Sequence, residues 1–225
     1  MKATEAQQKK LIGTVLSAAV QFYLRSQAER VESLKIHIGG NNRSLLSGRI
    51  PDVSVSARGV IYRGLHLSQI ALNASRIRIN LGQVLQGKPL QLLEPIPVEC
   101  DLQLYAGDLD ASARSPLLAD ALTQLLRSHF LLPAGNLENL QLTLGANRLK
   151  LTADLTGVPL TLTTQLQLAS PTQLRLAEPR LQMPHLVPET HRSDMTLDLG
   201  SDVDIQDLGV SAEQLTLRGI IWVKP

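Results

Sequence analysis

The chain has 225 residues, of which 44% are hydrophobic, 19% are charged and 3% are aromatic, and its formal net charge is +2. This balance is that of a globular protein and excludes a disordered chain, and the length suits one large domain. A net charge so close to zero identifies no class of partner. The single cysteine excludes an internal disulfide.

The first 31 residues carry the pattern of an amphipathic helix. Apolar residues recur at helical spacing, which predicts a long helix over residues 3–31 with one broad apolar stripe. The helix either packs on a sheet or lies on a membrane surface, and the small number of Lys and Arg on its polar face favours packing. The segment has no clear signal-peptide cleavage site, and no stretch reaches the roughly 20 apolar residues of a membrane span. We therefore expect a protein of the cytosol, or one peripheral to a membrane.

From Ser33 onward the apolar period changes to two residues, which indicates strands with one apolar and one polar face. Within the predicted strand from Leu65 to Leu81, the apolar phase shifts between Ala74 and Ile77. One skipped position of this kind predicts a β-bulge, and bulges bend sheets.

The second half of the chain begins with a helix and continues as a meander. Ser115 followed by Pro116 is typical of a helix start, and a second helix is predicted over residues 115–130. Because no Ser/Gly-rich or charge-rich linker divides the chain, we predict one α+β domain over residues 1–225. Its long N-terminal helix should pack on a curved, mostly antiparallel sheet. The later strands are predicted near residues 137–145, 148–156, 158–169, 172–182, 195–199, 202–206 and 212–223.

The sequence contains no recognisable constellation of catalytic or metal-binding residues. The five histidines show neither a His-Glu-x-x-His motif nor paired spacing on a helix, and Cys100 has no histidine near it in sequence. A phosphate-binding glycine loop and a nucleophile elbow are also missing. We predict no catalytic residue, no metal ligand and no cofactor, and hence no enzyme. A hydrolase acting on lipids is disfavoured because it would need a nucleophile.

Basic residues are concentrated in one part of the chain. Between Ser33 and Leu93, eight basic residues and one acidic residue give a net charge of +7, which leaves −5 for the rest. Proteins that bind single-stranded nucleic acid interleave aromatic residues with basic ones, and Tyr62 is the only aromatic residue of this segment. An anionic membrane surface therefore fits better than nucleic acid, with ordinary solvated arginines as an equal alternative. The candidates for membrane contact are Arg43, Arg49, Arg58 and Arg63.

Structural glycines, leucines and a helix start recur in several segments. These are Ile36-His-Ile-Gly39, residues 44–60 followed by Gly64-Leu-His-Leu67, residues 108–118 and residues 217–225. Together they resemble the LmeA-like phospholipid-binding family, in the branch common in cyanobacteria, over nearly the whole chain. The resemblance implies a fold similar to tubular lipid-binding domains, with an elongated apolar cavity, and lipid binding rather than catalysis. It transfers no individual lipid-contacting residue to this chain.

We therefore expect the protein to bind or carry a phospholipid in an apolar cavity, with transient contact to a membrane surface. The alternative is a non-enzymatic interaction or assembly protein with a fully packed core. A cavity of roughly several hundred Å³ favours the first over the second. From the apolar pattern, the candidate cavity residues are Leu11, Val15, Ala19, Phe22, Leu67, Leu72, Leu118 and Leu122.

Overall fold

The computed structural model describes residues 16–130, 132, 135–184, 190–191 and 193–225. Most of these residues form strands. One group of strands comprises β1 (Arg30–Gly39), β2 (Arg49–Tyr62), β3 (Leu65–Arg78), β4 (Ile96–Tyr105), β11 (Val203–Val210) and β12 (Gln214–Val223). The other comprises β5 (Leu137–Gly145), β6 (Arg148–Leu155), β7 (Val158–Ser170), β8 (Gln173–Gln182), β9 (Thr190–His191) and β10 (Met195–Asp198).

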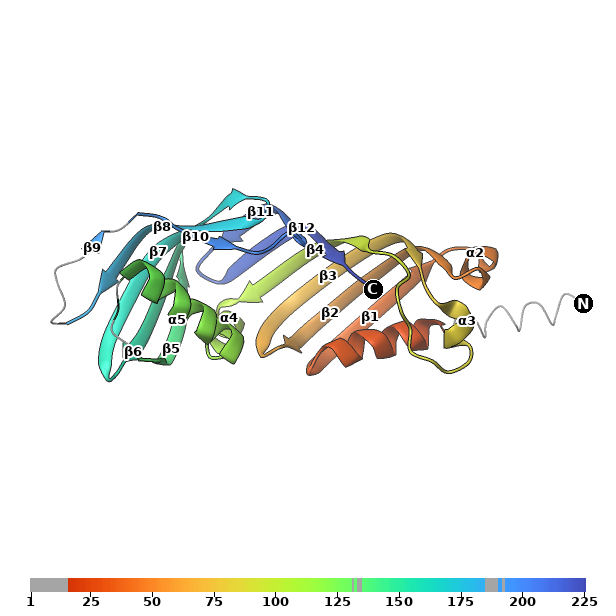
Figure 1. Cartoon of the computed structure of the whole chain (residues 1–225), viewed down its shortest axis with the longest axis horizontal. Coiled ribbons are helices and arrows are strands. Elements are labelled where there is room, and N and C mark those ends of the chain that lie inside the picture. The colour runs from red at the N-terminus through yellow and green to blue at the C-terminus, as the bar shows by residue number, and fades with distance from the viewer. Residues whose placement is uncertain (1–15, 131, 133–134, 185–189, 192) are drawn as a thin grey trace, which may run out of the picture.

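The strands form two antiparallel sheets that lie end to end in an elongated molecule (Figure 1). The first sheet has the order β1-β2-β3-β4-β12-β11, and the second has the order β10-β8-β7-β6-β5, with β9 paired to β8. The predicted α+β class and the antiparallel pairing are confirmed, whereas the expectation of one curved sheet is wrong. The chain leaves the first sheet after β4 and returns to it only with β11, so the intervening meander pairs with itself.

Five helices accompany the sheets in the described part of the chain. A helix over residues 16–27 lies against the first sheet, and the second sheet is covered by α5 (Figure 1). Helix α5 covers Pro116–Phe130. The other three helices are short, and their bounds are α2 (Asn42–Leu46), α3 (Leu81–Val84) and α4 (Ala106–Ala113).

The N-terminal helix ends earlier than predicted. Its described part covers residues 16–27 and β1 begins at Arg30, so the predicted extension to residue 31 is wrong. The cause is strand pairing, because the Glu29 N–H already donates to the Ile61 carbonyl at 2.8 Å. The predicted start near residue 3 lies outside the described residues. Of the apolar stripe, Leu16 is 1% exposed, whereas Phe22 is 73% exposed.

The strand irregularity expected near Ser75 is present, but it is not a one-sided bulge. Arg76 adopts a positive φ of 55°, opposite Pro51 of β2. Ile50 still pairs with Ile77, and Asp52 still pairs with Ser75, so the register is unchanged. Both strands shift their apolar phase at the same place, which a single strand's sequence cannot reveal. The register shift of the first sheet lies instead in β11, between Ile205 and Asp207.

Helix α5 confirms the second predicted helix. The Ser115 hydroxyl accepts a hydrogen bond from the Leu118 N–H at 3.3 Å, as expected for a side chain at a helix start. Leu126 and Phe130 are buried against the second sheet. The burial of this face explains why helical spacing in the sequence located the helix correctly.

Helix α4 is connected to both sheets by polar contacts. The Asp108 carboxylate accepts a hydrogen bond from Ser68 Oγ of β3 in the first sheet at 2.6 Å. The Asp110 carboxylate accepts one from the Leu142 N–H of β5 in the second sheet at 2.9 Å. Two carboxylates two residues apart therefore join the sheets. Helix α4 therefore has a structural role between the two sheets.

Replacement of Asp108 by alanine is expected to lower the free energy of unfolding by about 2 kcal/mol, because it removes a hydrogen bond to a charged group. It also leaves the Ser68 hydroxyl, which is 6% exposed, without its acceptor. Urea denaturation measures the change, and Asp120→Ala on the exposed side of α5 is the matched control. Equal stability of the two variants would contradict the structural role of Asp108.

Candidate functional site

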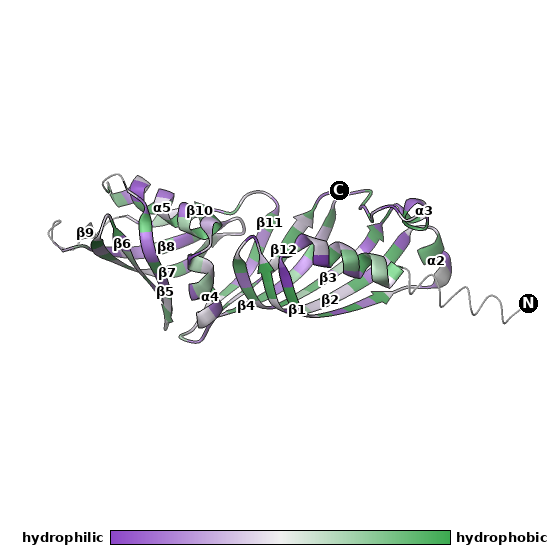
Figure 2. Cartoon of the chain, turned by 90° about the horizontal axis from the view of Figure 1, so that it is seen from below, coloured by the Kyte–Doolittle hydropathy of each residue, from purple (hydrophilic) through white to green (hydrophobic). Residues whose placement is uncertain are grey.

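The first sheet has one apolar face and one polar face. Hydrophobic and hydrophilic residues alternate along its strands (Figure 2). Directly paired residues of neighbouring strands lie on the same face, so each row across the sheet can be followed through the register. One row consists of Ile36, Val55, Leu72, Cys100 and Gly219. The next row, one residue along, consists of Lys35, Ser56, Ala71, Asp101 and Arg218. We call the first of these faces the inner face.

Three rows of the inner face start at Leu34, Ile36 and Ile38 of β1 and run across β2, β3 and β4 to β12. These rows contain no charged residue. The partners of these β1 residues are aliphatic, and the rows continue to β12 through β4. The residues that form this region are Leu34, Ile36, Ile38, Val53, Val55, Ala57, Ile70, Leu72, Ala74, Val98, Cys100, Leu102, Leu217, Gly219 and Ile221. Such a surface offers contacts only to hydrocarbon.

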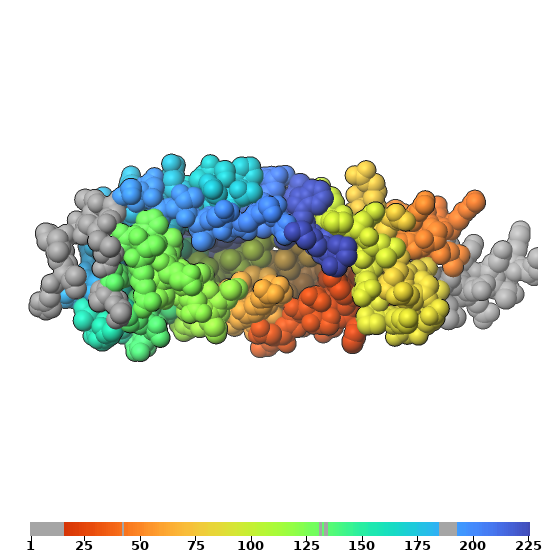
Figure 3. Space-filling model, viewed as in Figure 1, coloured from red at the N-terminus to blue at the C-terminus, as the bar shows by residue number. Residues whose placement is uncertain are grey.

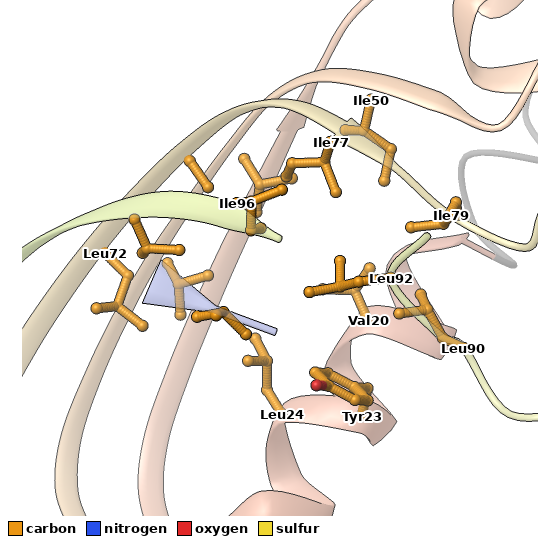
Figure 4. Close-up of a pocket in the computed structure, with 15 residues that line it drawn as sticks. Val20, Tyr23, Leu24, Ile50, Leu72, Ile77, Ile79, Leu90, Leu92 and Ile96 are labelled. Atoms are coloured by element: carbon orange, nitrogen blue, oxygen red, sulfur yellow. The ribbon is translucent and has the colours of Figure 1, made fainter. Parts of the chain in front are cut away.

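An apolar pocket of about 130 Å³ lies between the N-terminal helix and one end of the inner face (Figure 4). Val20, Tyr23 and Leu24 come from the helix, and Leu90 and Leu92 come from the segment between α3 and β4. Tyr23 is the only one of the described lining residues with a polar side chain. The strands and the chain end contribute Ile50, Val53, Val55, Leu72, Ala74, Ile77, Ile79, Ile96, Val98 and Val223.

No helix of the described residues packs on the middle of the inner face. The buried cores lie at its two ends, one under the N-terminal helix and one under α4 and α5. Ile70 and Leu102 lie between them, are only half-buried and belong to neither core. The same burial holds for Ile221 of β12, which lies beside the pocket residue Val98. Figure 3 shows a hollow in this region, bordered by the green, orange and blue parts of the chain. An open apolar strip thus continues from the pocket toward the second core.

The pocket by itself is small. Its volume of about 130 Å³ is close to that of an engineered cavity that holds one benzene molecule, and it lies below the range of roughly 300–1,000 Å³ for typical ligand pockets. About five carbon atoms of a hydrocarbon chain therefore fit inside. A longer chain has to continue along the open strip of the inner face.

The structure places the predicted cavity residues in different surroundings. Leu72 lines the pocket. Leu118 and Leu122 pack against the core of the second sheet instead. Leu67 is half-buried and pairs with Val60. Leu11 and Val15 lie outside the described residues.

Ala19 and Phe22 border a different recess of about 240 Å³, together with Gly87 to Leu90. The expectation that Phe22 lies inside a cavity is wrong, because its side chain is mostly exposed. Sequence reasoning also missed Leu90 and Leu92, which lie in the segment between α3 and β4. Their spacing of two residues was the available signal for an extended segment. Leu92 pairs with Ile79 in an isolated antiparallel β-bridge.

The four arginines predicted to contact a membrane do not form one surface. Arg43 lies in α2, and Arg49 begins β2 beside it. Arg58 is nine residues further along the same strand, a distance of about 30 Å at the usual rise per residue. Arg63 follows β2, and its guanidinium lies 5.5 Å from the centre of the Tyr62 ring. The first two arginines therefore lie near one end of the sheet and the other two near the opposite end.

Cys100 lies on the inner face, next to the pocket residue Leu72. Burial raises the pKa of its thiol to about 11, and the neighbouring Asp101 carboxylate adds to the effect. Both causes disfavour the thiolate. The side chain is thus a poor nucleophile that serves as part of the apolar surface, in agreement with its position on the apolar phase of the strand.

We expect alkylation of Cys100 by iodoacetamide at pH 8 to be about a hundredfold slower than that of a thiol with the ordinary pKa. The thiolate is the reactive form, and its fraction falls tenfold for each unit by which the pKa rises. Because the pKa is raised to about 11, the rate should increase about tenfold per pH unit from pH 8 to 10. Mass spectrometry of quenched samples gives the rate, with glutathione as the reference thiol. A plateau near pH 9 would contradict the raised pKa.

Among the residues that the structure describes, no group of three or more His, Cys, Asp or Glu side chains could hold a metal ion. The helices of the same residues include none that is long and apolar enough to cross a membrane.

Comparison with known proteins identifies the family of the chain. The model of a family described as LmeA-like phospholipid-binding matches residues 8–220, which is nearly the whole sequence. No curated protein and no solved structure matches the chain. The match over most of the chain agrees with the resemblance of its glycine- and leucine-containing segments. The protein therefore belongs to the LmeA-like phospholipid-binding family.

Proposed function

We propose that the protein binds a phospholipid by its acyl chain, with the chain end in the pocket and the rest along the inner face of the first sheet. The observation that carries this proposal is the strip of apolar residues that continues from the pocket and that no helix of the described residues covers. Leu72 lies at the pocket, and Leu102 and Ile221 continue the surface as half-buried side chains. The family of the chain supports a phospholipid as the ligand.

The energetics require both the pocket and the strip. Burying a methylene group contributes about 0.8 kcal/mol, so five carbons in the pocket contribute roughly 4 kcal/mol. Association itself costs an estimated 4 kcal/mol or more in lost freedom of motion. The pocket alone is therefore insufficient for tight binding, and further methylenes on the strip supply the rest.

The pocket of about 130 Å³ is smaller than the cavity that would by itself favour lipid binding over an interaction protein with a fully packed core, so the choice between them depends on the open strip. Packed cores lie at both ends of the inner face, but the middle leaves aliphatic side chains half-exposed. Contiguous apolar surface of this kind is usually a binding site. Its concave setting suits a narrow flexible chain better than a globular partner.

Head-group selectivity is expected to be weak. The residues listed for the inner face include no charged side chain, so the site offers the head group no ion pair. A lipid bound by its chain keeps its head group in water, where the desolvation penalty for charge is avoided. We therefore propose that chain length, more than head-group chemistry, determines affinity.

The experiment that tests the proposal uses Cys100 as a reporter on the inner face. Incubation with phosphatidylglycerol vesicles should slow its reaction with N-ethylmaleimide at least tenfold, because a bound chain covers the thiol. The matched control is Cys100→Ser combined with Ala71→Cys, which moves the thiol to the outer face in the neighbouring row. Equal protection at both positions would indicate coverage of the whole protein by the vesicle. No protection at Cys100 would contradict binding on the inner face.

A further inference from the structure

One end of the molecule is built from three short segments that lie next to each other. These are α2, α3 and the connection from α3 to β4, all at the same end in Figure 1. The Ile79 N–H donates to the Gly48 carbonyl at 2.9 Å, which ties the start of α3 to the end of α2. The Asn80 side chain fixes the connection, because its Nδ2 donates to the Pro89 carbonyl at 3.0 Å and its Oδ1 accepts from the Gln91 N–H at 2.8 Å.

Each of these segments exposes a leucine. Leu46 at the end of α2 is 55% exposed, Leu85 after α3 is 53% exposed, and Leu93 before β4 is 55% exposed. Single exposed leucines are common on protein surfaces. Three of them on adjoining segments at one end of an elongated molecule instead indicate an interaction surface. We call these three residues the leucine tip.

The leucine tip is accompanied by positive charge. Arg43 of α2, Arg49 of β2 and Lys88 are exposed, and none of them takes part in a salt bridge among the described residues. Arg78 also lies at this end, but Glu94 neutralises it at 3.6 Å. Apolar side chains beside uncompensated cations are complementary to an anionic bilayer, in which the head groups attract the cations and the acyl region accepts the leucines.

We propose that the protein docks on anionic membranes through the leucine tip, end-on with respect to its long axis. The pocket residues Leu90 and Leu92 belong to the same connection as Leu93, and Ile79 lies just before α3. Docking at this end therefore brings the pocket to the bilayer surface. The inference rests on the proposed function for its purpose, the transfer of a lipid, but the docking surface itself is argued from exposure and charge alone.

The test places a single tryptophan at the tip or at the other end of the molecule. The chain has one tryptophan, so Trp222→Phe provides a background without signal. Leu85→Trp reports on the tip, and Leu117→Trp is the matched control, because Leu117 is 47% exposed at the start of α5 near the second sheet. With phosphatidylglycerol vesicles, Leu85→Trp should shift its emission to the blue and be quenched by brominated acyl chains, whereas Leu117→Trp should show neither effect.

Removal of two charges tests the electrostatic part. Each basic residue near an anionic surface contributes about 1 kcal/mol, so Arg43→Ser with Lys88→Ser should weaken partitioning roughly thirtyfold. Phosphatidylcholine vesicles should bind the unaltered tip weakly. Quenching at Leu117→Trp, or equal binding of neutral and anionic vesicles, would overturn the proposal. A blue shift of Leu85→Trp that depends on protein concentration without vesicles would overturn it in favour of a second copy.

Failure of docking and failure of lipid binding can be told apart. Monomeric short-chain phosphatidylglycerol reaches the inner face from solution without a membrane. A variant with Leu46, Leu85 and Leu93 all replaced by serine should lose vesicle binding yet still show protection of Cys100 by this monomeric lipid. Retained vesicle binding by that variant would contradict the tip, and loss of protection in the unaltered protein would contradict the inner-face site.

Discussion

Replacement of Leu72 by tryptophan should weaken phospholipid binding nearly a thousandfold while the protein remains folded. Leu72 lines the pocket beside Cys100, and a larger side chain there intrudes into the volume of about 130 Å³ and blocks the entry of the acyl chain. The pocket's share of the binding free energy is roughly 4 kcal/mol, on the basis of five carbons at about 0.8 kcal/mol each. Titration with a fluorescent fatty-acyl phospholipid measures the loss.

The matched control for this variant is Asn73→Trp. Asn73 is the next residue of β3, is exposed and points to the outer face. It introduces the same side chain into the same strand without filling the pocket. Unchanged affinity of Leu72→Trp, or an equal loss in Asn73→Trp, would remove the pocket from the account of lipid binding.

Replacement of Leu16 by aspartate should lower the free energy of unfolding by several kcal/mol. Leu16 is 1% exposed and belongs to the core between the N-terminal helix and the first sheet. An unpaired carboxylate in that position loses its hydration without gaining a partner. Thermal or urea denaturation measures the effect.

Phe22→Asp provides the comparison for Leu16→Asp. It introduces the same charge into the same helix at a side chain that is 73% exposed, so stability should change by no more than about 0.5 kcal/mol. A similar loss in both variants would mean that the helix as a whole, and not its buried face, is sensitive to charge. No loss in Leu16→Asp would contradict the packing of the helix on the sheet.

Elements with local signals could be predicted from the sequence. The start of α5 is encoded by Ser115 and Pro116, and the strands from β5 to β8 agree with the predicted ones within about a residue. Turn residues separate these strands, and alternation defines their faces. The signal for α2 was present but overlooked: the Asn41 side chain accepts a hydrogen bond from the Ser44 N–H at 2.9 Å, as an N-cap does.

Features that depend on tertiary contacts could not be predicted. The end of the N-terminal helix is set by the pairing of Glu29 with Ile61 of β2, a residue distant in sequence. Helical spacing assigned Phe22 to the buried stripe because it cannot show how wide a face the sheet covers. The division into two sheets depends on which strands pair, and alternation within a strand carries no information on its partner. The prediction of one domain over residues 1–225 stays a prediction, which a single unfolding transition would support.

The candidate site was predicted in kind but only partly in detail. Aliphatic alternation indicated an apolar face, and Leu72, one of the predicted cavity residues, lines the pocket. The pocket's other wall comes from Leu90 and Leu92, whose segment contains prolines and glycines. The membrane candidates Arg43 and Arg49 lie next to the leucine tip, whereas the separation of Arg58 and Arg63 from them follows from the length of β2.

Native mass spectrometry of the purified protein tests the central claim most directly. After incubation with phospholipid vesicles and removal of free lipid, the account predicts a species heavier than the 24.5 kDa chain by the mass of one phospholipid. Leu72→Trp should show the mass of the bare chain under the same conditions, and Asn73→Trp should retain the adduct. A bare chain in the unaltered protein, with no phospholipid recovered by extraction, would contradict the proposal that the inner face of the first sheet binds lipid.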